Sequence, residues 1–189
     1  MIHRISCPER YEWVGCVDGD DYEIFRTFDG SSRASTWRPV RMKWIKSDGG
    51  RRFKSSDFPW LGTHVLIMRR RAVDALSDML EAGGEILPLA TDDGVELFVL
   101  NVTRVLDVLD EEHSTIDRFE DSGQIMFIEA AAFHEDLVRG VDFFKLPGRA
   151  CGIFVGERFI ERVRAAGLVG LDFPLAWSPE GGPVKRRLW

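Results

Sequence analysis

The sequence predicts an α+β fold with a mostly antiparallel sheet, two to four helices and a small N-terminal β meander. Strand-like segments outnumber helix-like ones and do not alternate regularly with them, which favours α+β over a doubly wound α/β sheet. Turns rich in aspartate and glycine separate the strand-like segments, as in hairpins. Since 44% of the 189 residues are hydrophobic, including 13 Phe and 6 Trp, the chain can build a sizeable core.

The predicted meander occupies residues 1–56, a β-rich lobe beside a main α+β body at 57–189. We expect the two parts to pack as one compact unit. Short segments at 12–17, 22–28 and 40–45 have the apolar patterning of strands, and Asp/Gly-rich turns lie between them.

The main body contains two predicted helices, at 71–82 and 157–166. Each has apolar residues at helical spacing on one face and is followed by glycine, a common C-terminal stop. The segment 102–109 is either a strand end or a short helix, and we favour the helix. Ser122-Gly123 is typical of a hairpin loop. Strands are predicted at 65–68, 85–89, 95–100, 124–129, 141–146 and 151–155.

Charge and composition exclude several classes of partner. A formal net charge of −6 disfavours nucleic acid, because phosphate contacts require a basic face. Apolar runs are far shorter than the roughly 20 residues of a membrane span, and the N-terminus has no signal-peptide core, so we expect a cytoplasmic protein without membrane contact. The three cysteines (Cys7, Cys16 and Cys151) are an odd, sparse set that fits a reducing compartment, with Cys151 as a buried, inert thiol.

No catalytic constellation is recognisable in the sequence. The four histidines stand at no metal-ligand spacing, and both a nucleophile elbow and a phosphate-binding glycine loop are missing. We therefore predict no metal, no cofactor and no enzymatic activity.

An acidic cluster and one tryptophan are the candidate binding residues. Asp107 and Asp110 would share one face of a helix. A solvated helix end is the ordinary interpretation, an acidic patch for a basic partner is the second, and carboxylate-pair catalysis is the third. Trp60, beside Phe58 and Pro59, is either a core side chain or a partner anchor. The candidate binding residues considered below are Asp107, Asp110, Glu111, Glu112 and Trp60.

The main body contains a series of short segments in a characteristic order: 57–61 (DFPWL), 84–89 (GEILPL), 100–107 (LNVTRVLD), 109–110 with Ser114, 143–146 (FFKL), 153–155 (IFV) and 167–173 (GLVGLDF). With these segments, residues 57–177 resemble a bacterial immunity family typified by a Myxococcus xanthus protein. Members are encoded beside polymorphic toxins, including type VI secretion effectors. The resemblance implies a cytosolic protein that binds a cognate toxin and neutralises it without catalysis. Asn101, Asp107, Asp110 and Lys145 are among the polar residues that match.

Two alternatives stay open beside this interpretation. One is an enzyme, either a hydrolase or a reverser of a toxin modification, that uses the acidic cluster around Asp107. It would need a polar pocket that collects Asp107, Asp110, Lys145 or His64 with shifted pKa values. The other is a small-ligand module with an apolar pocket lined by Trp and Phe. Homo-oligomerisation is left open.

Overall fold

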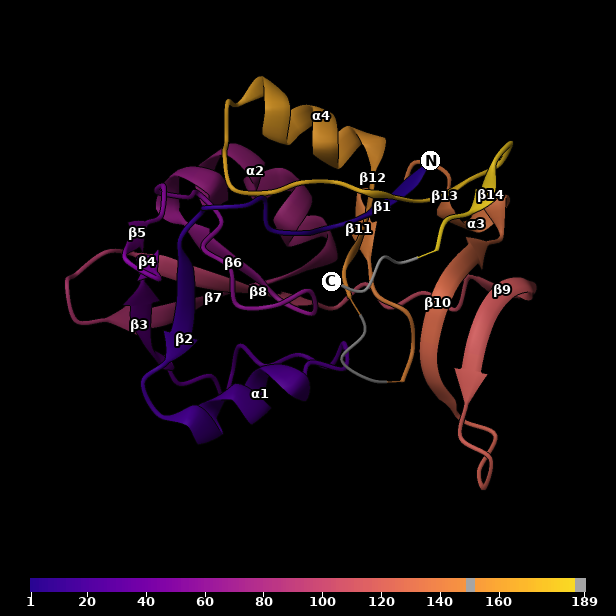
Figure 1. The fold of residues 1–189 in the computed structure, drawn as a ribbon, viewed down its shortest axis with the longest axis horizontal. Coiled ribbons are helices and arrows are strands. Elements are labelled where there is room, and N and C mark those ends of the chain that lie inside the picture. Colours follow the sequence, from indigo (N-terminus) through magenta and orange to yellow (C-terminus); the bar gives the residue numbers. More distant parts are fainter. Residues whose placement is uncertain (149–151, 186–189) are drawn as a thin grey trace.

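The computed structural model describes residues 1–148 and 152–185, and it confirms an α+β fold with mostly antiparallel sheets (Figure 1). Cys151, and with it the beginning of the strand predicted at 151–155, lies outside the described residues. Cys7 and Cys16 are free thiols.

The first five-stranded sheet has the order β2-β3-β7-β8-β6. Neighbouring strands are antiparallel except for β3 and β7, which run parallel. A short hairpin with two residues in each strand, β4 (Ser47–Asp48) and β5 (Arg51–Arg52), follows β3 in the chain. The strands of the sheet are β2 (Trp13–Cys16), β3 (Arg41–Ile45), β6 (Leu66–Arg69), β7 (Gly84–Thr91) and β8 (Leu97–Val102).

The second five-stranded sheet has the order β11-β12-β1-β13-β14 and is antiparallel throughout. Beside it, β9 (Leu109–Arg118) and β10 (Ile125–Phe133) form a long two-stranded ribbon. The strands of the second sheet are β1 (Ile2–Arg4), β11 (Phe143–Phe144), β12 (Phe154–Gly156), β13 (Leu175–Ser178) and β14 (Gly182–Pro183).

Two amphipathic helices confirm the predictions from apolar spacing. They are α2 (Arg70–Gly83), which ends at the Gly83-Gly84 pair, and α4 (Glu157–Ala165), which is followed by Gly167 at a φ of 61°. The shorter helical elements are η1 (Gly19–Asp21), α1 (Tyr22–Arg26) and α3 (Glu135–Val138). Of the helices in the described chain, none combines the length and the apolar character that crossing a membrane requires.

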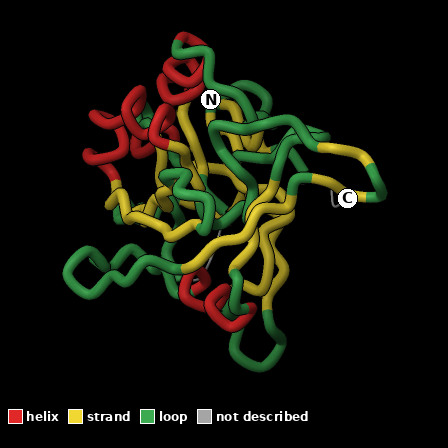
Figure 2. The backbone as a smooth tube through the Cα atoms, turned by 90° about the vertical axis from the view of Figure 1, so that its left-hand side faces the viewer, coloured by secondary structure: helices red, strands yellow, loops and turns green. Residues whose placement is uncertain are grey.

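The first sheet has helices on both faces. Met68 of β6 and Leu100 of β8 point to the face where α2 and α4 pack, whereas Ile67 and Val99, their neighbours in the chain, point to the face covered by Phe25 of α1. This alternation follows from the period of two along a strand. Figure 2 shows the strands between the short α1 below and the larger helices above.

The N-terminal residues contribute to both sheets. β1 pairs with β12 and β13, and β2 and β3 complete the edge of the first sheet. The antiparallel pairing of β2 with β3 is the part of the predicted meander that forms. A domain boundary at residue 56 stays a prediction.

The strand predicted at 22–28 is wrong, because this segment forms helix α1. Phe25 and Phe28 are fully buried, and they stand three residues apart, so that a helical turn brings them together. Their rings meet edge to face at 5.8 Å, and both contact Trp37. As a helix, the segment directs the rings of Phe25 and Phe28 toward the same face of the first sheet.

The helix favoured at 102–109 is also wrong. β8 continues to Val102, and the amide groups of Thr103 and Arg104 both donate to the carbonyl oxygen of Gly83. The Leu106 amide donates to the carbonyl oxygen of Lys145 at 2.9 Å. These three donors therefore bond to distant segments, and the Val105 amide bonds only two residues back, to Thr103, so no helical turn forms.

A buried polar cluster fastens the loop after α1 to the first sheet. Asn101, which is fully buried, donates from Nδ2 to the Ser31 carbonyl oxygen and to Glu85 Oε2, both at 2.9 Å. Burial acts to raise the pKa of Glu85, but donors from Ser32, Arg33 and Asn101 outweigh it, so the pKa of that carboxyl lies below its ordinary value. Asn101 thus has a structural role.

Candidate protein-binding site

The acidic residues lie on the β9–β10 ribbon, which we call the acidic ribbon (residues 109–133). It arches away from the second sheet, and its turn points away from the body (Figure 1). The turn includes Ser122-Gly123, with Gly123 at a φ of 66°, which confirms the predicted hairpin loop. Its first strand escaped prediction because Asp and Glu are depleted in strands.

A wide bulge interrupts the ribbon where the acidic residues are densest. Ala130 lies opposite Thr115, whereas Ala132 lies opposite Asp110, so four β9 residues face a single residue of β10. Bulges of this kind re-aim side chains and recur next to functional sites. Glu111, Glu112 and His113 are exposed here and leave the regular ladder.

Asp110 holds the shape of the bulge. Its Oδ1 accepts a hydrogen bond from the His113 amide at 3.2 Å, and its Oδ2 lies 2.8 Å from Nδ1 of the same residue. Ser114 donates from Oγ to the Asp110 carbonyl oxygen at 2.6 Å and accepts from the Ala132 amide at 2.9 Å. Burial acts to raise the pKa of Asp110, but the His113 donors outweigh it and lower the pKa. Asp110 is therefore partly a structural residue.

Glu111 and Glu112 are the exposed carboxylates of the bulge. Glu111 forms an ion pair with Arg118 at 2.5 Å, and both side chains are exposed. For Glu112, the described chain shows neither a hydrogen bond nor an ion pair. Asp107 is exposed too, but it lies in the loop before β9, so the shared helix face expected for Asp107 and Asp110 does not exist.

The whole ribbon is strongly negative, and the predicted candidates Asp110, Glu111 and Glu112 are only part of its charge. Residues 109–133 contain seven carboxylates and one arginine, a formal charge of −6, equal to that of the entire chain. Asp117, Glu120 and Asp121 extend the charge to the turn, and all three are exposed. The Asp-Ser-Gly turn was the available signal, because a hairpin loop before 124–129 requires a partner strand that includes these residues.

An aromatic cluster anchors the base of the ribbon. Phe133, at the end of β10, meets Phe144, Phe154 and Trp177 edge to face, with ring centroids 5.6, 5.0 and 6.0 Å apart. Edge-to-face packing is a favoured aromatic arrangement. The exposed ion pair of Lys185 with Glu129 adds a contact farther along the strand. The ribbon is therefore fixed at one end and solvated at the other.

Trp60 lies away from the acidic ribbon. Its carbonyl oxygen accepts from the Val14 amide at 2.9 Å, which places it beside β2 at the opposite end of the molecule (Figure 1). Its side chain is partly buried against the hydrophobic cluster beneath α2 and α4. The structure does not bring Trp60 together with the acidic candidates.

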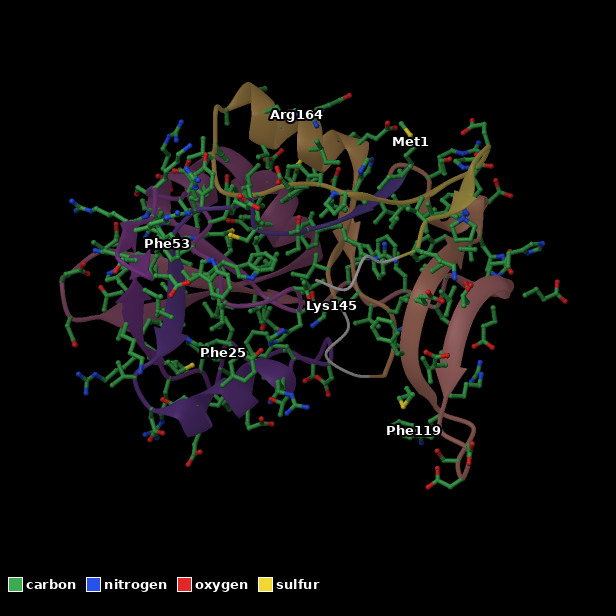
Figure 3. The ribbon with its side chains drawn as sticks, in the orientation of Figure 1. Met1, Phe25, Phe53, Phe119, Lys145 and Arg164 are labelled. Atoms are coloured by element: carbon green, nitrogen blue, oxygen red, sulfur yellow. The ribbon has the colours of Figure 1, made fainter. Side chains whose placement is uncertain are left out.

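The residues named for an enzymatic alternative converge only in part. Lys145 is buried at the centre of the molecule (Figure 3) and donates from Nζ to the carbonyl oxygens of Phe28 and His64. Burial, followed by the charge of Lys145, lowers the pKa of His64 to about 4. Asp107 and Asp110 stay in the loop and ribbon. Lys145 and His64 thus lie together in the interior, apart from the acidic candidates.

Two surface cavities lie elsewhere. One cavity, of about 170 Å³, lies between α3 and the second sheet, and its lining includes Ile2 of β1, Val138 of α3 and Trp177 of β13. The other, of about 290 Å³, lies at the end of β3 and is lined by Glu12, Lys46, Arg52, Phe53, Ser55 and Arg69. Neither includes an acidic candidate. Within residues 1–148 and 152–185, no three metal-ligating side chains gather at one point.

Comparison with known proteins bears on the segment that contains the ribbon. No curated protein matches the chain. Residues 90–176 match the model of a family described as "Immunity protein family (Imm11)", and this segment includes the whole acidic ribbon and Lys145. The resemblance to a bacterial immunity family is therefore confirmed over residues 90–176.

Proposed function

We propose that this chain is an immunity protein that binds a cognate bacterial toxin and blocks it by occupying its surface, without catalysis. The match over residues 90–176 supports an immunity role. The system would be a polymorphic toxin or a type VI secretion effector, and neutralisation would take place in the cytoplasm of the producing cell.

The acidic ribbon is the proposed docking surface, and its charge is the observation that carries this choice. Six net negative charges on one projecting hairpin attract a basic partner and speed the encounter. The bulge presents Glu111 and Glu112, and Met126 on β10 is 52% exposed as an apolar contact. The proposed toxin therefore has a basic surface.

Charge reversal tests this surface without disturbing the fold. The double variant Glu111→Lys/Glu112→Lys leaves Asp110 in place to hold the bulge. We expect its affinity for the toxin encoded in the adjacent gene to fall at least about tenfold at low salt, since each 1.4 kcal/mol is tenfold. At high salt the difference should shrink, because exposed charges are screened.

The matched control is Glu9→Lys/Glu81→Lys, which changes the net charge equally at exposed positions outside the ribbon. It should bind like the wild type. Equal affinity of both double variants, measured by calorimetry at two salt concentrations, would remove the ribbon from the interface.

A titration separates binding from catalysis. A protein that blocks its toxin by occupancy protects only when it is present in at least equimolar amount, whereas an enzyme that reverses toxin damage restores the target in many turnovers. We expect toxin activity in vitro to reach zero at one equivalent. Full rescue of a poisoned target at a few per cent of one equivalent would favour the enzyme around Asp107.

A further inference from the structure

The outer face of β2 and β3 is uncovered, although it belongs to the sheet face that α2 covers elsewhere. On β6 and β8 this face carries Met68 and Leu100, which pack under the helices. On β2 and β3 it carries Trp13 and Ile45, paired across the strands and 45% and 38% exposed. Two adjacent exposed apolar side chains on a rigid sheet suit a docking surface.

The residues around this face are strongly basic. Residues 38–54, which we call the basic end, contain seven lysines and arginines and one aspartate, a formal charge of +6, and Asp92 and Asp93, which pair with Arg41 and Lys46, reduce it to +4. Lys43 lies opposite Gly15 on the neighbouring strand. Because glycine has no side chain, the residue opposite Lys43 does not cover its ammonium group. Throughout the described chain, no carboxylate lies within ion-pair distance of Lys43, Arg51 or Arg52.

The basic end and the acidic ribbon lie at opposite ends of the longest axis. Phe53 marks the basic end, and Phe119 marks the turn of the ribbon (Figure 3). The charges of +4 and −6 are opposite in sign, and each surface adds an exposed apolar residue, Trp13 on one and Met126 on the other. The two surfaces of one chain are thus complementary to those of another copy.

We propose that the basic end docks the acidic ribbon of a second copy of this chain. A second copy fits better than nucleic acid, because the molecule is negative overall and its ribbon would repel a polyanion. The contact is heterologous, joining two different surfaces of the same protein. Since the toxin is proposed to bind the same ribbon, toxin binding and self-association exclude each other.

Sedimentation of the pure protein tests the association in the absence of toxin. At about 50 mM NaCl we expect the average mass to rise above the 21.5 kDa of the monomer as concentration increases, and to return to it at about 500 mM. Because toxin is absent, a negative result leaves the toxin-binding proposal standing.

Two charge-reversed variants make the test specific. Lys43→Glu/Arg51→Glu has a damaged basic end, and Glu111→Lys/Glu112→Lys has a damaged ribbon. Each variant alone should be a monomer, because its changed surface no longer attracts its partner surface. An equimolar mixture should recover association, because the added glutamates of one variant then face the added lysines of the other. Recovery in the mixture also shows that both variants are folded.

Arg164→Glu is the control, since Arg164 is exposed on α4 without an ion partner in the described chain (Figure 3). It should associate like the wild type. A wild-type protein that stays monomeric up to about 300 µM at low salt would overturn the proposal. So would a monomer that binds a duplex DNA probe through Lys43 and Arg51, which would assign the basic end to nucleic acid.

Discussion

Lys145 donates a hydrogen bond from its Nζ to the carbonyl oxygen of Phe28, 117 residues earlier in the chain, at 3.0 Å. Its side chain is 2% exposed, and the carbonyl oxygen of His64 accepts a second bond at 3.2 Å. The lysine therefore joins the end of α1, the loop before β6 and β11 at one buried point. A buried ammonium group is tolerated only when such acceptors satisfy it.

Replacing this lysine should destabilise the fold. In Lys145→Met the carbonyl oxygens of Phe28 and His64 lose their donor, and each buried unsatisfied acceptor costs about 1–3 kcal/mol. We expect the free energy of unfolding in urea to fall by about 2–5 kcal/mol. Lys185→Met, at an exposed ion pair, should change it by less than about 0.5 kcal/mol. Equal stabilities of the two variants would contradict a structural role for Lys145.

Truncating the aromatic anchor should loosen the ribbon from the body. Phe133→Ala removes three edge-to-face contacts and leaves a cavity, which typically costs about 3–5 kcal/mol. Met126→Ala, on the same strand but exposed, should cost less than about 0.5 kcal/mol. Thermal unfolding compares the two variants. Hydrogen exchange along β9 and β10 should rise in Phe133→Ala, and unchanged exchange would show that the ribbon is held by other contacts.

The buried histidine should make stability depend on pH. Burial, followed by Lys145, lowers the pKa of His64 from 6.5 to about 4 in the folded protein. Between these values the unfolded chain binds a proton that the folded chain does not, so stability is full above pH 6.5 and declines as pH falls toward 4.

His64→Gln removes this contribution, and the decline between pH 6.5 and 4 should be shallower than in the wild type. His134→Gln, at an exposed position where the side chain makes no capping hydrogen bond, serves as the control. Urea midpoints measured across this interval provide the comparison. A His64→Gln curve parallel to the wild type would show that other groups carry the pH dependence.

A glycine in a crowded loop should resist substitution. Gly170 has a φ of 107°, and an added Cβ would collide with the hydroxyl group of Ser56. Gly182 has a φ of 69° but open space at the same position. We expect Gly182→Ala to cost about 1 kcal/mol for its backbone conformation alone, and Gly170→Ala about 2–4 kcal/mol because steric crowding adds to it. Similar losses in both variants would refute the crowding.

Periodicity sufficed for the two long helices. Apolar residues such as Leu76 of α2 and Ile160 of α4 repeat at helical spacing, and glycine follows each helix. Local pattern failed at 22–28, where the burial of Phe25 and Phe28 against a distant sheet chooses the helix. It failed again at β9, whose strand conformation depends on pairing with β10.

The candidate site was predicted in composition but not in shape. The density of carboxylates at 107–112 was visible, and the structure places Asp110, Glu111 and Glu112 on one bulge. Asp107 stands apart in a loop, and Trp60 lies at the other end of the molecule. Side chains that are neighbours in sequence share a surface only if the local backbone allows it, and here a bulge replaces the expected helix.

The sequence by itself determined the α+β class, the amphipathic helices, the hairpin turn and the excess of negative charge, because each depends on composition or on contacts a few residues apart. Only the tertiary structure decided that the charge separates into an acidic ribbon and a basic end, and that Lys145 bonds to Phe28. These features join residues from distant parts of the chain, and packing across the two sheets sets them where local preference does not.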